Sequence, residues 1–144
     1  MASFGFFADA NLTQPLDRNN PKTLVFNVAN GGQYIDFQIW FGSTDSAYKA
    51  QPVPPDTYIT VEIQDTDPSA HNFDAVNGPW YQIADTQANL SSAPKNTPFS
   101  LGTEALGGVA NAKSIWIRIY EPEQNPAVYT DFVITTNNIQ VVPV

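Results

Sequence analysis

The stretch Lys113–Glu121 constrains the fold of this chain more than any other. Every second position holds an isoleucine: Ile115, Ile117 and Ile119. The positions between them hold two aromatic side chains and a cation: Trp116, Arg118 and Tyr120. A β-strand places alternate side chains on opposite faces, and full burial of each isoleucine contributes about 1.5–3 kcal/mol. The stretch therefore predicts a central strand, with one face in the core and an aromatic face left for a second layer or a binding surface.

The same period of two, bounded by Gly, Pro, Asn and Asp, predicts the remaining strands. We expect them at Ser3–Phe7 (an edge strand), Thr23–Val28, Gln33–Phe41, Tyr58–Gln64, Trp80–Ala84, Pro98–Leu101, Val128–Thr135 and Ile139–Val142. Asn30-Gly31-Gly32 predicts a hairpin turn. The proline-rich stretch Gly42–Thr57 predicts a long surface connection, and Asp85–Ala93 a single helical turn capped by Asp85.

Eight or nine short strands with almost no helical periodicity indicate an all-β chain with a single domain over residues 1–144. We predict an antiparallel two-sheet sandwich, either jelly-roll-like or immunoglobulin-like. The cysteines of true immunoglobulin domains are missing, so the strand order stays open.

The charge and the cysteine count exclude several functions. Fourteen acidic and six basic residues give a formal net charge of −8, which opposes binding to nucleic acid or to an anionic membrane. With no cysteine there is no disulfide, thiolate metal ligand or catalytic thiol. The first residues have no basic and apolar leader pattern, so we expect a soluble chain made in the cytosol.

Reactive groups are sparse in the sequence. Asp65 and Asp67, with Asp74 nearby, place oxygen ligands at alternate positions as a calcium loop does, but the glycine and the terminal glutamate of that loop are missing. Aspartate also forms ordinary turns, so we predict no metal or other cofactor. His71 has no second histidine or cysteine to complete a site, and we expect a solvated side chain.

Carboxylates are the remaining candidates for catalysis. Glu62 and Glu104 are the pair we would test for glycoside hydrolysis. A plain solubilising role suits all four glutamates considered: Glu62, Glu104, Glu121 and Glu123. No catalytic motif accompanies any of them, and we predict that the chain is not an enzyme.

Five aromatic residues form the candidate interaction surface, since flat rings stack on the apolar faces of sugars. They are Trp40, Trp80, Tyr81, Trp116 and Tyr120. The alternative is that these rings fill the second face of a sandwich or a contact between subunits.

Four stretches resemble a group of small virion proteins of tailed bacteriophages. They are Phe6-Phe-Ala-Asp-Ala-Asn-Leu-Thr-Gln-Pro-Leu16, Trp40-Phe-Gly-Ser-Thr44, Gly107-Gly-Val-Ala-Asn-Ala-Lys-Ser-Ile-Trp-Ile-Arg-Ile119 and Tyr129-Thr-Asp-Phe-Val-Ile134. The resemblance implies a capsid decoration or cement protein with a jelly-roll-like sandwich, and it transfers no functional residue. Similar sandwiches occur in phage tails and baseplates, which stay open as alternatives.

The resemblance also implies partners and a location. The major capsid protein would be the partner, with the chain on the outer capsid surface of a virion assembled in the host bacterial cytoplasm. We expect a symmetric homo-oligomer, with the edge strands Ser3–Phe7 or Ile139–Val142 pairing with another chain. The alternative is a carbohydrate-binding, receptor-binding module that uses the tryptophans.

Overall fold

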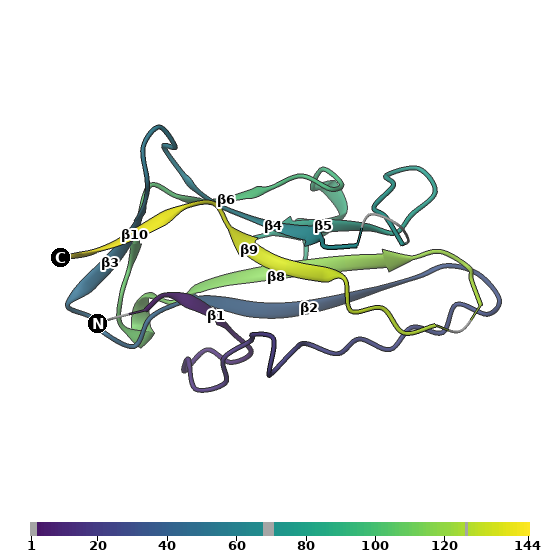
Figure 1. Cartoon of the computed structure of the whole chain (residues 1–144), viewed down its shortest axis with the longest axis horizontal. Helices are drawn as coiled ribbons and strands as arrows, with labels where there is room; N and C mark the ends of the chain where they lie inside the picture. Colours follow the sequence, from purple (N-terminus) through teal and green to yellow (C-terminus); the bar gives the residue numbers. More distant parts are fainter. Residues whose placement is uncertain (1–2, 68–70, 126) are drawn as a thin grey trace.

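The computed structural model describes residues 3–67, 71–125 and 127–144, and within them the fold is all-β (Figure 1). Helical structure in these residues is limited to two 3-10 turns, η1 (Leu90–Ser92) and η2 (Val109–Asn111), and none of it is long and apolar enough to cross a membrane. The strands are β1 (Gly5–Phe7), β2 (Gln33–Gly42), β3 (Tyr48–Pro52), β4 (Ile59–Asp65), β5 (Trp80–Ala84), β6 (Phe99–Gly102), β7 (Ala105–Leu106), β8 (Lys113–Glu121), β9 (Phe132–Thr136) and β10 (Ile139–Pro143).

The strands form three antiparallel sheets, with the orders β1-β2-β8-β5, β10-β3-β7 and β6-β4-β9. β8 is an inner strand of the four-stranded sheet, as its alternation predicts, and it pairs with β2 along its whole length. The last part of the chain bends from β9 in one sheet to β10 in another, so it joins both three-stranded sheets (Figure 1).

All three sheets contribute to one hydrophobic core. Ile115 and Ile117 of β8 and Ile59 and Val61 of β4 are fully buried. Ala50 of β3 is also fully buried in this cluster, so the sheet that contains β10 rests on the same core. One continuous core explains why alternation predicted these strands so well.

Most predicted strands are confirmed within a few residues. The strand predicted over Thr23–Val28 is wrong, because this segment has no ladder partner in the structure. Leu24 and Phe26 still pack on the core, but the N–H of Asn27 donates to the side-chain Oε1 of Gln33, at 2.7 Å, and not to a neighbouring strand.

Two other predictions need correction, and one strand was missed. The connection Gly42–Thr57 contains β3, since the prolines sit at its end and beyond it and leave the N–H groups before them free to pair. The short β7 was not predicted. The helical turn predicted over Asp85–Ala93 is the shorter 3-10 turn η1, whose Leu90 is fully buried and whose N-cap is Asn89 and not the predicted Asp85.

Candidate functional site

The outer face of the four-stranded sheet holds four of the five aromatic residues of the candidate interaction surface. Tyr120 pairs across the strands with Tyr34 and Trp80, and Trp116 pairs with Gln38 and Ala84. Tyr81 points to the opposite face and is 3% exposed in the core. Burial raises the pKa of its hydroxyl. Tyr81 therefore does not share the surface with the other four.

Trp80 and Tyr120 stack on one another, with centroids 5.0 Å apart and an interplanar angle of 15°. The ammonium of Lys95 lies 4.4 Å from the centroid of the Trp80 ring, a cation–π distance. A Cβ on Gly78 would lie 2.7 Å from Cε1 of Tyr120, so the Tyr120 ring also rests against backbone. These two rings are engaged within the chain, which leaves them little open face for a sugar.

An ion pair lies at the centre of this outer face. Arg118 donates to both carboxylate oxygens of Asp36, with Nε–Oδ1 at 2.7 Å and Nη2–Oδ2 at 3.0 Å. These hydrogen bonds lower the pKa of Asp36 and raise that of Arg118, against the opposing effect of burial. Ser91 and Gln87 add hydrogen bonds from the segment that contains η1.

That segment covers part of the outer face. η1 packs against β5 and β8, and the side chain of Gln82, on β5, donates to the carbonyl of Ala93 at 2.7 Å. Trp40 and Trp116 lie on the outer face and are partly buried. Because Trp40 pairs with Ser114 on β8 and Trp116 pairs with Gln38 on β2, the two tryptophans are diagonal neighbours on this face.

A second cluster, which we call the histidine cluster, lies at one end of the molecule and consists of His71, Glu121 and Asp131. Nε2 of His71 lies 2.8 Å from Oε2 of Glu121, and Nδ1 lies 3.3 Å from Oδ1 of Asp131. The three side chains are 4%, 8% and 9% exposed, respectively. The expectation that His71 is solvated is wrong, because its side chain is buried against the end of β8 and the residues around the start of β9.

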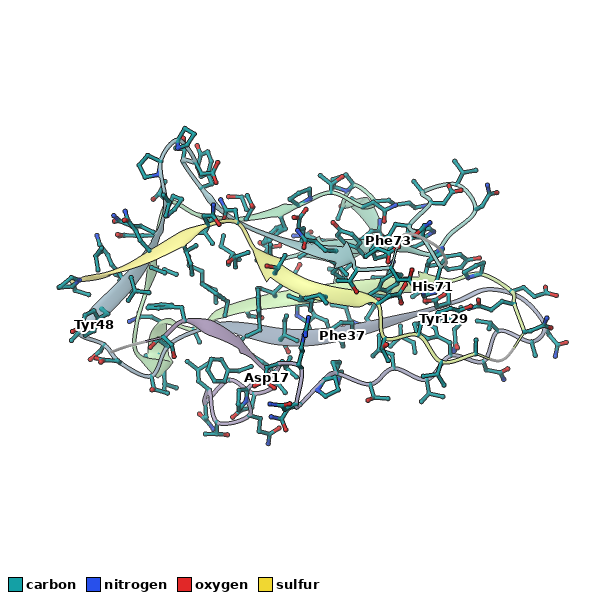
Figure 2. The ribbon with its side chains drawn as sticks, in the orientation of Figure 1. Asp17, Phe37, Tyr48, His71, Phe73 and Tyr129 are labelled. Carbon is teal, nitrogen blue, oxygen red and sulfur yellow. The ribbon has the colours of Figure 1, made fainter. Side chains whose placement is uncertain are left out.

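Aromatic rings stack on the imidazole of the histidine cluster, and Phe73, His71 and Tyr129 lie in the same region of Figure 2. Tyr129 stacks on His71 with centroids 3.6 Å apart, and Phe132 stacks on it at 4.7 Å. Phe73 continues the column, with its centroid 4.1 Å from that of Phe132. The column ties the loop after β4 to the chain before β9.

The geometry of the histidine cluster favours a structural role. Each ring nitrogen of His71 lies within hydrogen-bond distance of a carboxylate oxygen, so the imidazole bridges Glu121 and Asp131. The two nitrogens face different carboxylates, so the three groups do not converge on one ion, and in the described part of the chain no group of three or more His, Cys, Asp or Glu residues is arranged to hold a metal ion. Asp131 Oδ2 is buried without a hydrogen-bond partner among the described residues.

The acidic residues considered for calcium act in turns. Asp65 accepts a hydrogen bond from the N–H of Asp67, at 2.9 Å, and Asp74 accepts from the N–H groups of Val76 and Asn77. The latter bonds lower the pKa of Asp74. These aspartates serve as local caps, which is the ordinary role of such residues in loops.

The two glutamates considered for hydrolysis have separate partners. Glu104 forms an ion pair with Lys49 at 2.7 Å, and Glu62 accepts a hydrogen bond from Gln64 at 2.9 Å. Glu62 lies on β4 and Glu104 lies in the connection between β6 and β7, so each has its own local role.

An open depression of about 210 Å³ adjoins the histidine cluster. It is lined by Thr66, Asp67, Val128, Tyr129, Thr130 and Asp131.

A comparison of the chain with protein-family models, curated protein sequences and solved structures finds no match.

Sequence reasoning missed the histidine cluster because its members are far apart along the chain. No local pattern indicated it, because His71 has a left-handed backbone conformation (φ 57°) and lies in an irregular segment, where the alternation of a strand does not apply. Nothing in the sequence shows that Glu121 and Asp131 lie against that segment, since that follows from how β8 and β9 meet.

Proposed function

We propose that the chain is a structural virion protein of a tailed bacteriophage, a capsid decoration or cement protein that binds the major capsid protein on the outer face of the shell. One observation carries this proposal. Three of the four stretches that resemble virion proteins are distant in the sequence and meet at one corner of the structure, which we call the glycine corner.

The glycine corner is built from β1, the end of β2 and the start of β8. Phe6 of the first stretch pairs with Phe41 of the second, and Phe41 pairs in turn with Lys113 of the third. The N–H of Gly108 donates to the carbonyl of Ser43 at 2.8 Å. The resemblance is therefore concentrated in residues that support one exposed part of the scaffold.

The close packing of the glycine corner explains why glycines punctuate these stretches. A Cβ on Gly107 would fall on the backbone carbonyl of Asp45, and one on Gly42 would lie 3.1 Å from Leu12. Such positions fix the shape of a corner and carry no reactive group, as expected of a contact protein.

The proposal includes the finer description of the fold as a jelly-roll-like sandwich. It is supported by the shared core, in which the four-stranded sheet faces strands of both smaller sheets. A decoration protein needs only a modest patch in each copy, because many identical weak contacts add up over a shell.

Co-sedimentation with empty shells of the particle to which the chain belongs tests the proposal. Val109, which is 40% exposed at the glycine corner, offers a probe, since an aspartate there would introduce a charge into the contact. We expect Val109→Asp to reduce shell affinity about tenfold. Val76→Asp, at an 88% exposed position between β4 and β5, is the matched control and should bind as the parent does.

The parent chain staying in the supernatant at both low and high salt would reject this function. Equal shell binding by Val109→Asp and Val76→Asp would show that the glycine corner is not the contact with the shell.

The second candidate is a tail or baseplate module that binds carbohydrate, and the observation favouring it is the adjacent, partly buried pair Trp40 and Trp116. Intrinsic fluorescence measured with a series of host polysaccharides tests it. A change that disappears in Trp40→Phe together with Trp116→Phe supports this candidate, and an unchanged spectrum with every polysaccharide rejects it.

A further inference from the structure

β10 is an edge strand whose outer side faces no strand in the structure. It pairs only with β3 in the described part of the chain, and the Ile139–Pro143 ladder is regular throughout. In the four-stranded sheet, by contrast, both edge strands have additional backbone partners. Phe6 of β1 accepts a hydrogen bond from the N–H of Leu16, and Tyr81 of β5 accepts one from the N–H of Asn96.

The ladder shows which backbone groups of β10 point outward. The N–H of Val144 donates to the carbonyl of Ala47, and the carbonyl of Asn138 accepts from the N–H of Val53, both at 3.0 Å. Hydrogen-bonded pairs alternate in an antiparallel ladder, so even-numbered residues of this strand face β3. The backbone groups of Ile139, Val141 and Pro143 therefore point away from the sheet, and Pro143 has no N–H to leave unpaired there.

We infer that β10 pairs antiparallel with β10 of a second copy of the chain, about a two-fold axis at Val141. In this register the two Val141 residues exchange both hydrogen bonds, and each Ile139 N–H donates to the carbonyl of the other copy's Pro143. The missing N–H of Pro143 costs one bond at each end and leaves the centre intact. The pairing joins two three-stranded sheets into one continuous sheet.

The charge pattern favours a second copy as the occupant. The chain carries a net charge of −8, so two copies repel unless they meet where charge is absent. Residues 132–144 contain no charged side chain, and β10 consists of β-branched residues, glutamine and proline. Edge strands that avoid pairing usually carry a lysine or another charge, which β10 lacks.

Val141→Pro is the most direct test of this edge, because it removes an N–H that points outward and leaves the hydrogen bonds to β3 in place. The parent chain should associate reversibly as its concentration rises to about 1 mM, toward twice its 15.8 kDa mass in analytical ultracentrifugation. We expect Val141→Pro to weaken this association at least tenfold with unchanged circular dichroism. Gln140→Pro is the control for loss of folding, since its N–H faces β3.

A charge exchange tests the register and remains informative if proline disturbs the strand. Gln140 and Val142 face one another across the two-fold axis on one side of the joined sheet. Gln140→Glu with Val142→Glu should weaken the dimer through like charges. Gln140→Lys with Val142→Glu should restore it, because opposite charges then meet. If the two double variants dissociate equally, the register centred on Val141 is wrong.

The inference does not depend on the proposed function, and the two can fail separately. A chain that keeps its monomer mass up to about 1 mM, or a Val141→Pro dimer as tight as the parent dimer, rejects the pairing whatever the shell experiment shows. A monomer whose shell binding is lost in Val141→Pro also rejects it, since the edge would then bind a strand of the shell protein. A dimer that never binds shells retains the pairing and rejects the decoration function.

Discussion

At the scale of single residues, several close contacts depend on one side chain or on its absence. Gly107 is the tightest, because its N–H donates to the carbonyl of Tyr48 at 2.8 Å while its Cα faces the backbone of Asp45. Backbone cannot move aside as a flexible side chain can, so the space at this position is fixed by the connection between β2 and β3.

We predict that Gly107→Ala lowers the free energy of unfolding by about 1–3 kcal/mol, the typical range for overpacking. Urea unfolding measures it. Gly5→Ala is the matched control, since a Cβ there meets nothing within 4 Å, and it should change stability by less than about 1 kcal/mol. Equal effects of the two substitutions would contradict the steric argument.

The histidine cluster makes a different prediction. His71→Phe keeps a ring in the aromatic column but removes both hydrogen bonds, which leaves Glu121 and Asp131 buried without their shared partner. We expect a loss of about 3 kcal/mol in the free energy of unfolding near neutral pH.

Neutral partners provide the control for the histidine cluster. In a background with Glu121→Gln and Asp131→Asn, His71→Phe should cost at least about 1 kcal/mol less, because no buried charge is left unpaired. An unchanged cost would show that His71 contributes through packing alone.

The Asp36–Arg118 pair predicts an acid-dependent contribution to stability. The hydrogen bonds from Arg118 lower the pKa of Asp36 from its ordinary value of 3.8, so this stability is present above that value and is lost as the pH falls through the lower folded-state pKa. Both side chains are nearly buried, at 12% exposed for Arg118 and 11% for Asp36. Arg118→Met should therefore cost about 2 kcal/mol near neutral pH.

Chemical unfolding across the acid range measures this dependence. The difference between the parent and Arg118→Met should shrink as the pH falls below 3.8 and Asp36 becomes protonated in both proteins. A difference that stays constant through this range would show that the pair contributes no pH-dependent stability.

At the scale of elements, alternation predicted the strands whose two faces meet different surroundings. β8 is reproduced residue for residue, and β5 likewise. β3 was not predicted because Tyr-Lys-Ala-Gln-Pro has too few apolar side chains to show the two-residue period of a strand, and only Ala50 is fully buried in the core. A short strand that depends on its neighbours for pairing leaves little trace in its own sequence.

The segment Thr23–Val28 shows the opposite error. Its alternation is real, since Leu24 and Phe26 pack on the core while Val25 is 83% exposed, but side-chain burial alone does not create a ladder. The alternation predicts which side chains are buried, whereas a ladder of backbone hydrogen bonds also requires a neighbouring strand at hydrogen-bond distance.

Hydrogen exchange checks this view of the segment. Amides of β8 should be the most protected in the chain, and those of Thr23–Val28 should exchange near the rate of an unstructured peptide. Asn27 is the expected exception, because its N–H donates to Oε1 of Gln33. Gln33→Ala should remove that protection, and strong protection throughout the segment would contradict the absence of a ladder.

At the scale of the whole molecule, the sequence predicted which side chains face the core and which face outward, but it did not predict which distant segments contact one another. It separated the core face of the four-stranded sheet from the outer aromatic face, and four of five candidate residues lie on that outer face. Tyr81 was misplaced because it adjoins Trp80 in a strand, where neighbours point to opposite sides. The histidine cluster depends on contacts between distant segments, which periodicity does not report.

The sharing of one core by three sheets leads to the last prediction, which concerns cooperativity. Val61, Ala50 and Ile117 belong to different sheets and are all fully buried in the same cluster, so separating one sheet exposes side chains of the others. The chain should then unfold in a single transition, with the same urea midpoint by far-ultraviolet circular dichroism and by tryptophan fluorescence. For 144 residues the heat-capacity change should be about 2 kcal/mol/K. The two probes are independent, because all three tryptophans lie on the four-stranded sheet whereas circular dichroism reports every strand. Separate midpoints would mean that the sheet containing β3 and β10 melts on its own and that the chain is more than one cooperative unit.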